Sequence, residues 1–383
     1  MSRNISKKPR LAIISDTAMY TNVNTFVYEP VLREVVNFAH LFNDISWLGF
    51  GYLAKPPLDS SDSIPSNIKL VKLSPSGGDS VLDKLKVFTL IPNYIAQIIK
   101  VIYLYEIIHV RGPSIPALIT IMFSFLFPKK IFWHKYAGSW SIKPDAISYS
   151  LQRWLLKRSS NQKIIISELS SRVYPHISTW ENACLSNHEI KTNKQTGLNK
   201  LFSEKMTFCF IGRFDSDKGF FALLDAFKKI NQANWINKLH CVGGSINSLI
   251  KDDIQNSNVP ILLHGSLSRE KLDDIYKESH FIILPSNSEG FPKVLMEAAS
   301  FGCIPIVSPL DSILAYFNNT LGNAIVLSNI NSKGIQETII NIKNKNNLDK
   351  ISWNAMNSVS QFSYEVYNER IESYILKEYY KKK

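Results

Sequence analysis

The chain has 383 residues, 45% of them hydrophobic and 20% charged, a composition that excludes a largely disordered protein. At roughly 100–200 residues per domain, this length predicts two domains. The net charge of +12 is concentrated in residues 1–199, where 23 Lys and Arg stand against 13 Asp and Glu, whereas the remainder holds 21 against 19. A basic half can bind nucleic acid, an anionic membrane or a phosphorylated substrate, or it can be a merely soluble surface.

The first half of the chain alternates short apolar runs with segments of helical spacing. Between the first two predicted strands, residues 26–42 place apolar side chains at helical intervals. Residues 115–127 are strongly apolar but shorter than the ~20 residues that span a bilayer, so we expect a buried helix there, with a membrane-dipping segment as the alternative. The predicted strands are Leu11–Ser15, Ile45–Gly49, Ile107–Val110, Ile131–His134 and Lys163–Ile166.

The second half repeats this alternation after a polar stretch, residues 186–205, which we interpret as an interdomain linker. Its predicted strands are Met206–Ile211, Leu239–Val242, Ile261–His264, Phe281–Leu284, Ile304–Val307 and Ala324–Leu327. Strands that alternate with helices predict an α/β fold with parallel sheets covered on both faces. We expect domains at 1–190 and 206–360, a linker at 191–205, and a helix at 361–383 that packs back toward the N-terminal domain.

The cysteines bear on the cellular compartment. Cys184, Cys209, Cys241 and Cys303 are widely separated and form no Cys-x-x-Cys pair. This spacing argues against a zinc site and against a disulfide framework, and it favours the reducing cytosol.

A first candidate site follows the strand Met206–Ile211. Gly212 allows a tight turn there, and Arg213 and Lys218 follow in the loop and at the start of the next helix. Open parallel sheets bind ligands at the carboxyl ends of their strands, and two cations there suit a diphosphate. The alternative is that both side chains are simply solvated. Asp215 and Asp217 could hold a divalent cation, but helix capping is the simpler interpretation, and we expect no metal.

A second candidate site follows the strand Phe281–Leu284. Gly290 permits close approach of a ligand to the backbone, Pro292 suits the first turn of a helix, and Gly302 suits its end. The amino end of such a helix binds phosphate. Glu289 precedes the helix, and Glu297 lies within it among apolar neighbours, where a carboxylate needs a partner or a ligand such as a ribose diol. The alternative is that Glu297 lies on the helix surface.

These residues resemble a known family. Glu289-Gly290-Phe291-Pro292 followed by Glu297-Ala298, after Gly212-Arg213 and Lys218-Gly219, is similar to the retaining glycosyltransferases of family 4 over roughly residues 206–330. The resemblance implies the GT-B fold, in which two Rossmann-like domains with parallel sheets face a central cleft. It implies that Arg213 and Lys218 bind the donor diphosphate, that Glu297 binds the ribose, and that Glu289 contacts the transferred sugar beside the backbone of residues 290–292.

The N-terminal half resembles the family less closely. His134 matches a histidine that faces the donor sugar in such enzymes, with a structural histidine as the alternative. Arg111 ends another predicted strand at the same edge and could contact donor or acceptor. The usual glycine-rich loop after the first strand is absent, and residues 16–22, beginning with Asp16, stand in its place.

The predicted function is retaining transfer of a sugar from a nucleotide sugar to an acceptor hydroxyl, with no cofactor and no obligatory metal. The resemblance implies a lipid-linked or glycan acceptor in cell-surface polysaccharide synthesis. The basic N-terminal domain, which carries the acceptor in this fold, then predicts peripheral contact with the inner face of the plasma membrane from the cytoplasm. The alternative is a non-catalytic sugar-nucleotide binder or scaffold. A Rossmann oxidoreductase lacks its Gly-x-Gly-x-x-Gly motif here, and no motif supports nucleic-acid binding.

Overall fold

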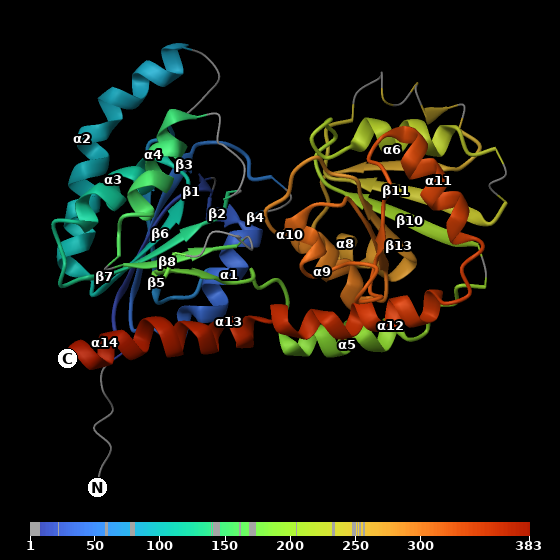
Figure 1. Cartoon of the computed structure of the whole chain (residues 1–383). Helices are drawn as coiled ribbons and strands as arrows, with labels where there is room; N and C mark the ends of the chain where they lie inside the picture. Colours follow the sequence, from blue (N-terminus) through green and yellow to red (C-terminus); the bar gives the residue numbers. More distant parts are fainter. Residues whose placement is uncertain are drawn as a thin grey trace, which may run out of the picture. The chain divides into compact units, whose positions relative to one another are not determined.

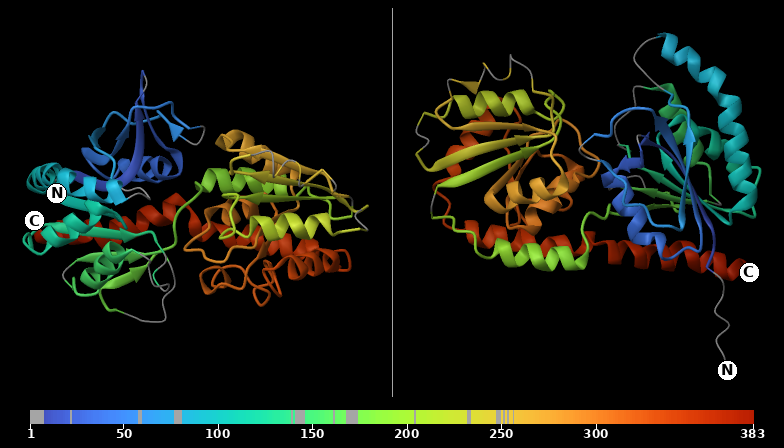
Figure 2. Two further views of the ribbon diagram at one scale, coloured as in Figure 1. Left: turned by 90° about the horizontal axis from the view of Figure 1, so that it is seen from above. Right: turned by 180° about the vertical axis from the view of Figure 1, so that it is seen from behind.

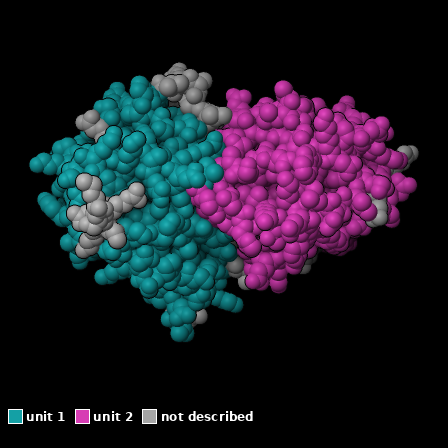
Figure 3. Space-filling view, turned by 90° about the horizontal axis from the view of Figure 1, so that it is seen from below, with its two compact units in different colours: residues 1–181, 366–383 teal, residues 182–365 magenta. Residues whose placement is uncertain are grey.

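The structure is a computed structural model. It describes residues 8–383 except 22, 58–59, 77–80, 139, 141–145, 161, 168–173, 204, 232–233, 247–249, 251, 253 and 256, and omits the side chains of 81–85. The chain divides into two compact units: unit 1 comprises residues 1–181 and 366–383, and unit 2 comprises residues 182–365 (Figure 1, Figure 3).

Unit 1 is built on a mainly parallel sheet. Its parallel strands lie in the order β5 (Ile68–Leu73), β3 (Ile45–Tyr52), β1 (Leu11–Thr21), β6 (Ile107–Gly112), β7 (Ile131–Tyr136), β8 (Lys163–Ile166) and β9 (Ile177–Thr179). Two short strands, β2 (Thr25–Tyr28) and β4 (Ser60–Ser61), pair antiparallel beside the far end of β1. The main strands are parallel, as predicted, and these two short strands add antiparallel pairing beside β1.

Helices cover both faces of the sheet of unit 1. On one face lie α2 (Val81–Leu104), α3 (Ile115–Ser124) and α4 (Ile147–Leu156) (Figures 1 and 2). On the other face lies α1 (Glu29–Ala39), whose Phe38 ring contacts Trp133 at 5.7 Å between centroids. The C-terminal segment of unit 1 continues α13 (Tyr364–Arg370) through a π-helical turn (Ile371–Leu376) into α14 (Lys377–Lys382).

Helix α2 is apolar enough over residues 86–104 to cross a membrane, judged by length and composition alone. Tyr94, Ile98 and Ile102, spaced by four, are nevertheless buried in the core that α2 shares with the sheet and α3. In this structure α2 therefore packs one side against the core of unit 1, with 22% of its apolar window buried.

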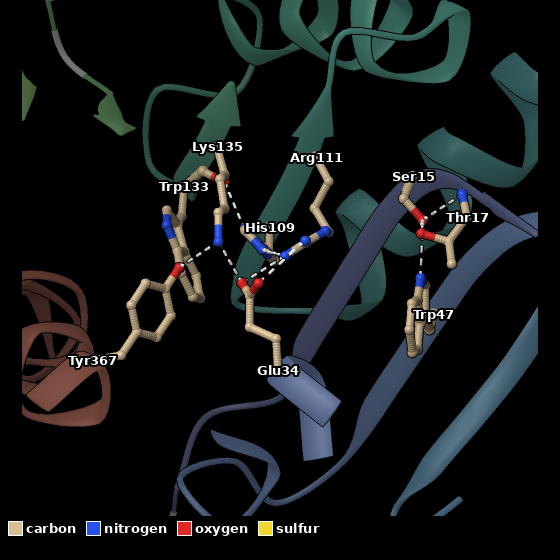
Figure 4. Close-up of polar contacts among 9 residues, drawn as sticks. All are labelled: Ser15, Thr17, Glu34, Trp47, His109, Arg111, Trp133, Lys135 and Tyr367. Atoms are coloured by element: carbon tan, nitrogen blue, oxygen red, sulfur yellow. Dashed lines mark hydrogen bonds and ion pairs between the residues drawn. The ribbon is translucent and has the colours of Figure 1, made fainter. Parts of the chain in front are cut away.

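The first strand differs from its prediction. β1 runs to Thr21 instead of ending at Ser15, and its pairing with β3 shifts register between Ile14 and Ala18. A hydrogen bond from Trp47 Nε1 to Ser15 Oγ (2.9 Å) and one from Ser15 Oγ to Thr17 Oγ1 (2.9 Å) fix this bulge (Figure 4). A bulge that lets the strand continue thus occupies the place of a glycine-rich loop.

Unit 2 contains a six-stranded parallel sheet. Its order is β12 (Ile261–Gly265), β11 (Ile236–Val242), β10 (Met206–Ile211), β13 (Phe281–Leu284), β14 (Ile304–Val307) and β15 (Ile325–Val326). Its helices include α6 (Phe220–Lys228) and α11 (Ser332–Ile342), which pack together, α8 (Arg269–Glu278), α9 (Lys293–Ser300), the short α10 (Asp311–Leu314), and α12 (Leu348–Ser358) with its 3-10 extension (Val359–Phe362). Each of the eleven predicted strands corresponds to a strand of the structure.

The polar stretch predicted as a linker contains a helix. α5 (Asn187–Gly197) begins with a capping box formed by Ser186 and Glu189. Asn193 Nδ2 donates to Ser300 Oγ at 2.9 Å, and a Cβ on Gly197 would come within 2.8 Å of the Gly302 backbone. The Asn193 hydrogen bond and the close approach of Gly197 attach α5 to unit 2. The chain passes between the units at residues 181–182 and 365–366.

Candidate functional site

In the sheet of unit 2, the direction in which successive strands are added reverses at β10. From β10 the chain proceeds outward through β11 and β12, and then returns to β13 on the other side of β10. Loops that leave the carboxyl ends of two such strands diverge and leave a crevice where ligands bind. The loop after β10 carries Gly212, Arg213 and Lys218, and the loop after β13 carries Glu289 and Gly290. We call this place the switch point of unit 2.

The two loops at the switch point are joined through their backbones. Asn287 N donates to Asp217 O at 2.7 Å, and Asn287 Nδ2 donates to Ser216 O at 2.8 Å. Gly219 has a φ of 69°, and a Cβ on it would lie 2.0 Å from the carbonyl oxygen of Pro285. Only glycine fits this approach, so the sequence keeps the two loops close.

The central contact of the switch point is an ion pair between the two loops. Lys218 Nζ lies 2.7 Å from Glu289 Oε1, and the same oxygen accepts a hydrogen bond from Ser286 Oγ at 2.7 Å. The carbonyl oxygen of Glu289 accepts a further hydrogen bond from Ser312 Oγ at 2.6 Å. The Lys218 side chain is 23% exposed and that of Glu289 9%. Water therefore reaches the lysine, while two partners hold the Glu289 carboxylate and a third holds its backbone.

Arg213 lies further out at the switch point. Its Nε contacts Asp215 Oδ2 at 2.6 Å, and Asp215 Oδ1 accepts a hydrogen bond from the Lys218 backbone at 2.9 Å. Burial would raise the pKa of Asp215, but the hydrogen bonds from Arg213 and from the Lys218 backbone outweigh it and lower that pKa. Asp215 thus caps the loop. Among the residues that the structure describes, no three His, Cys, Asp or Glu side chains gather in a way that could hold a metal ion.

The backbone of the second loop is anchored by an aromatic side chain. The Phe291 ring packs against Tyr316 and Phe362, at centroid distances of 5.7 and 5.4 Å. Pro292 is the N-cap of α9, which ends at Ser300 before Gly302 adopts a φ of 77°. The predicted start and end of this helix are therefore confirmed. Gly290 lies between the anchored ring and Glu289, where its backbone borders the switch point.

Gly212 is held from the neighbouring strand. Its N–H donates to Val242 O at 2.9 Å, and Gly243, with a φ of 112°, approaches it so closely that a Cβ would lie 2.9 Å from Gly212 O. The glycines therefore allow β10 and β11 to end side by side at the switch point.

Glu297 has partners within unit 2. Its Oε2 lies 2.8 Å from Arg269 Nη1 and accepts a hydrogen bond from Tyr276 OH at 3.2 Å. Burial would lower the pKa of Arg269, but the charges of Glu297 and Asp273 outweigh it and raise that pKa. Glu297 is therefore a buried carboxylate fixed by a guanidinium. Neither of these two contacts involves Oε1, the atom from which a ribose contact would have to be made.

In unit 1, His134 lies inside the protein. β7 continues two residues beyond it, and the ring is 1% exposed on the face covered by α3 and α4. With Ala117, Gln152 and Leu156 it lines a cavity of about 10 Å³, too small for a ligand. Burial lowers the pKa of His134 to about 4, against a smaller opposing effect of Gln162. Of the two interpretations of His134, the structure favours the structural histidine.

Arg111 belongs to a buried charge cluster. Its Nη1 lies 2.8 Å from Glu34 Oε1, and Lys135 Nζ approaches the same oxygen at 2.6 Å (Figure 4). Lys135 also donates to Tyr367 OH at 3.3 Å. Two cations from neighbouring strands thus share one carboxylate from α1, which is 1% exposed. Burial and the charge of Arg111 lower the pKa of His109 beside this cluster, so the imidazole is neutral.

Asp16 lies at the bulge of β1 and is exposed, unlike Ser15 and Thr17 on either side. The protein around its carboxyl group nevertheless displaces water and raises its pKa, against smaller opposing effects of a backbone hydrogen bond and of Arg111. Asp16 therefore presents a carboxyl group at the carboxyl edge of the sheet of unit 1.

Several site residues could not be singled out in the sequence. Ser286, Asn287 and Ser312 position Glu289 and its loop, Arg269 fixes Glu297, and Glu34 fixes Arg111. For Ser286 and Asn287, the position just after the predicted strand Phe281–Leu284 could have indicated a place in the site. The others lie far from their partners in sequence.

Comparison with known proteins identifies a family whose model matches part of the chain. Residues 191–356 match the family model described as glycosyl transferases group 1. Over 158 residues the chain is 24% identical to a Klebsiella pneumoniae protein described as an uncharacterized 41.2 kDa protein in cps region, which covers 41% of this chain. A second match, 23% identical over 195 residues, is to a Methanocaldococcus jannaschii protein described as an uncharacterized glycosyltransferase. The matched segments span 39% of the first relative's own length and 50% of the second's.

Solved structures extend the likeness to the whole chain. Sucrose-phosphate synthase from Thermosynechococcus elongatus superposes with a TM-score of 0.70 at 15% identity, over 97% of this chain and 99% of that one. Anabaena HepE, solved in complex with UDP-glucose, superposes with a TM-score of 0.65 at 12% identity, over 96% and 100%. At such identities the likeness concerns the fold alone, and it confirms the predicted GT-B architecture of two parallel-sheet units.

Proposed function

We propose that the chain, whose residues 191–356 match the glycosyl transferases group 1 family, transfers a sugar from a nucleotide-sugar donor to an acceptor hydroxyl. The observation that carries the proposal is the Lys218–Glu289 ion pair, at 2.7 Å, which joins the loops after β10 and β13 at the switch point. A partly exposed cation beside an oriented carboxylate suits a ligand that combines a diphosphate with sugar hydroxyls.

The donor diphosphate would bind Lys218, Arg213 and the amino end of α9. Donor binding then replaces the carboxylate partners of both cations by phosphate oxygens, and frees Glu289 to accept hydrogen bonds from the transferred sugar. Glu297, fixed by Arg269, would accept a ribose hydroxyl through Oε1. The complex of HepE with UDP-glucose supports a uridine diphosphate sugar as the first donor to test.

The difficult step of such a transfer is departure of the nucleoside diphosphate as the anomeric carbon becomes cationic. Lys218 and Arg213 would stabilise the negative charge that develops on the leaving oxygen. Removing one such preorganised donor costs ~10²–10³ in kcat in other enzymes. The proposal includes retention of anomeric configuration without a metal, so that a chelator leaves the rate unchanged.

For the acceptor, we propose a lipid-linked or glycan hydroxyl in cell-surface polysaccharide synthesis, reached from the cytoplasm. The relative in a cps region supports this assignment. The basic composition of residues 1–199 supports an acceptor that carries phosphate. Asp16, exposed at the edge of the sheet of unit 1, is the carboxylate we assign to that acceptor side.

A thermal-shift panel of UDP-, GDP- and ADP-sugars, each also tested as the free nucleoside diphosphate, tests the proposal. A ligand at 100 times its Kd stabilises the folded state by about 2.7 kcal/mol. We expect one nucleotide class to raise the Tm, and the same donor to be turned over when acceptor is added. If no nucleotide raises the Tm, the donor site is refuted. Binding without turnover against lipid-linked and glycan acceptors would identify the non-catalytic binder instead.

A further inference from the structure

Unit 1 exposes an apolar stripe along α4. Ile147, Leu151 and Trp154 follow one another at intervals of four and three residues, which places them on one side of the helix. They are 87%, 40% and 50% exposed. The opposite side of α4 is buried through Gln152, Arg153 and Leu156. The solvent-exposed side of the helix therefore carries large apolar side chains of the kind that are ordinarily buried.

Apolar side chains are exposed on the neighbouring helix as well. α3 packs beside α4, and Met122, Phe125 and Leu126 at its carboxyl end are exposed as well. Phe125 and Arg158 line one cavity of about 130 Å³, so the carboxyl ends of the two helices meet. We call these six side chains the α3–α4 apolar face: Met122, Phe125, Leu126, Ile147, Leu151 and Trp154. Large exposed apolar surfaces on soluble proteins mark sites that contact other proteins or membranes.

Basic side chains adjoin the α3–α4 apolar face at the carboxyl ends of its helices. Exposed Lys129 follows Leu126 in the sequence, and Lys157 and exposed Arg158 follow Trp154. Arg158 continues the stripe one turn beyond Trp154, with its guanidinium 4.0 Å from the centroid of the Trp154 ring. An apolar helix face that ends in tryptophan and arginine is typical of helices that lie in the interface of a membrane.

We propose that the α3–α4 apolar face docks unit 1 onto an anionic lipid surface. The apolar side chains would enter the boundary between headgroups and acyl chains, and Arg158 with its basic neighbours would meet the lipid phosphates. A second copy of the chain is a poorer occupant, because two such faces in contact would bring like charges together. The docking does not depend on the proposed glycosyl transfer, although it would bring the protein to a lipid-linked acceptor.

Flotation of the full chain with vesicles tests this proposal. The vesicles contain either phosphatidylcholine alone or phosphatidylcholine with one-third phosphatidylglycerol, in 0.1 M salt. The variant is the double substitution Leu151→Ser and Trp154→Ser, both at exposed positions. The control is Trp353→Ser in α12 of unit 2, since Trp353 is 46% exposed and also has a cation over its ring, Lys194 at 4.4 Å.

We expect the wild type and the Trp353→Ser control to float with the anionic vesicles, and the double variant to bind at least about tenfold more weakly. Binding should also weaken when the salt is raised to 0.5 M, because exposed charges are then screened. Three results would overturn the proposal. The wild type could fail to bind anionic vesicles, the double variant could bind like the wild type, or the wild type could be a dimer without lipid that the double substitution converts to a monomer.

Discussion

The two sheets carry ion pairs near their carboxyl ends that have the same chemistry and different exposure. In unit 1, Arg111 and Lys135 share Glu34, and the lysine and the glutamate are almost completely buried. In unit 2, Lys218 pairs with Glu289, but water reaches the lysine. An exposed cation can exchange a carboxylate for a phosphate at little cost, whereas breaking a buried pair leaves an uncompensated charge inside the protein. The comparison separates a structural ion cluster from a binding site.

The largest effect should follow from the buried cluster. Glu34→Ala leaves two cations in unit 1 without their shared carboxylate, and we expect it to lower the free energy of unfolding by about 3–5 kcal/mol. Urea denaturation monitored by circular dichroism measures this change. Glu337→Ala, which removes an exposed pair with Lys333, should cost less than about 0.5 kcal/mol. A loss below 1 kcal/mol for Glu34→Ala would show that the cluster is not structural.

The exposed pair should instead affect turnover. We expect Lys218→Ala to lower kcat about 10²–10³-fold, because the departing diphosphate loses a stabilising cation, while the Tm changes little. Donor consumption and thermal unfolding are measured on the same preparation. Lys229→Ala is the matched control, since Lys229 forms an exposed pair with Asp225 at 2.5 Å within unit 2. Activity of Lys218→Ala within twofold of the wild type would remove Lys218 from the mechanism.

His134 gives a smaller effect that depends on pH. Its pKa of about 4 in the folded state lies below the ordinary 6.5, so between these values only the unfolded chain takes up the proton. Stability is therefore lost as the pH falls through this window, by about 2 kcal/mol from pH 7 to pH 5.

The variant His134→Leu isolates that contribution. Its free energy of unfolding should fall less than that of the wild type between pH 7 and pH 5, and its turnover at pH 7 should stay within about threefold. A hundredfold loss of turnover with an unchanged pH dependence of stability would instead restore His134 as a residue that faces the sugar.

The smallest effect concerns the partner of Glu297. We expect Arg269→Gln to lower the free energy of unfolding by about 1.5 kcal/mol, because a charged hydrogen bond to the buried Glu297 carboxylate is lost. It should also raise the KM for the donor with kcat unchanged, since Glu297 loses its fixed orientation. An unchanged KM would mean that Glu297 serves only to hold α8 against α9.

The sequence predicted most of the fold because the central strands are buried on both faces and appear as unbroken apolar runs. Met206–Ile211, Phe281–Leu284 and Ile304–Val307 match their strands residue for residue. The strands that it missed are short or alternate with polar residues, as in β5 (Ile68–Leu73). The linker prediction overlooked α5, whose stability comes from a capping box and contacts with α9 rather than from apolar spacing.

For the candidate site, local motifs identified the loops but not their partners. Lys218 and Glu289 could be named because each follows a predicted strand in a recognisable motif. Arg111 and His134 occupy similar positions in sequence, and only burial distinguishes them from Lys218. Glu34 and Arg269, which hold their neighbours in place, are 77 and 28 residues from the side chains they pair with. Pairings at such separations depend on the tertiary fold.

Calorimetric titration with UDP, or with the diphosphate of whichever donor raises the Tm, tests the central claim most directly. The donor site at the switch point of unit 2 predicts saturable binding to the wild type. It predicts binding at least about tenfold weaker to Lys218→Ala, because a charge-assisted contact to phosphate is removed, and unchanged binding to Lys229→Ala. Equal affinities of Lys218→Ala and the wild type would contradict the account.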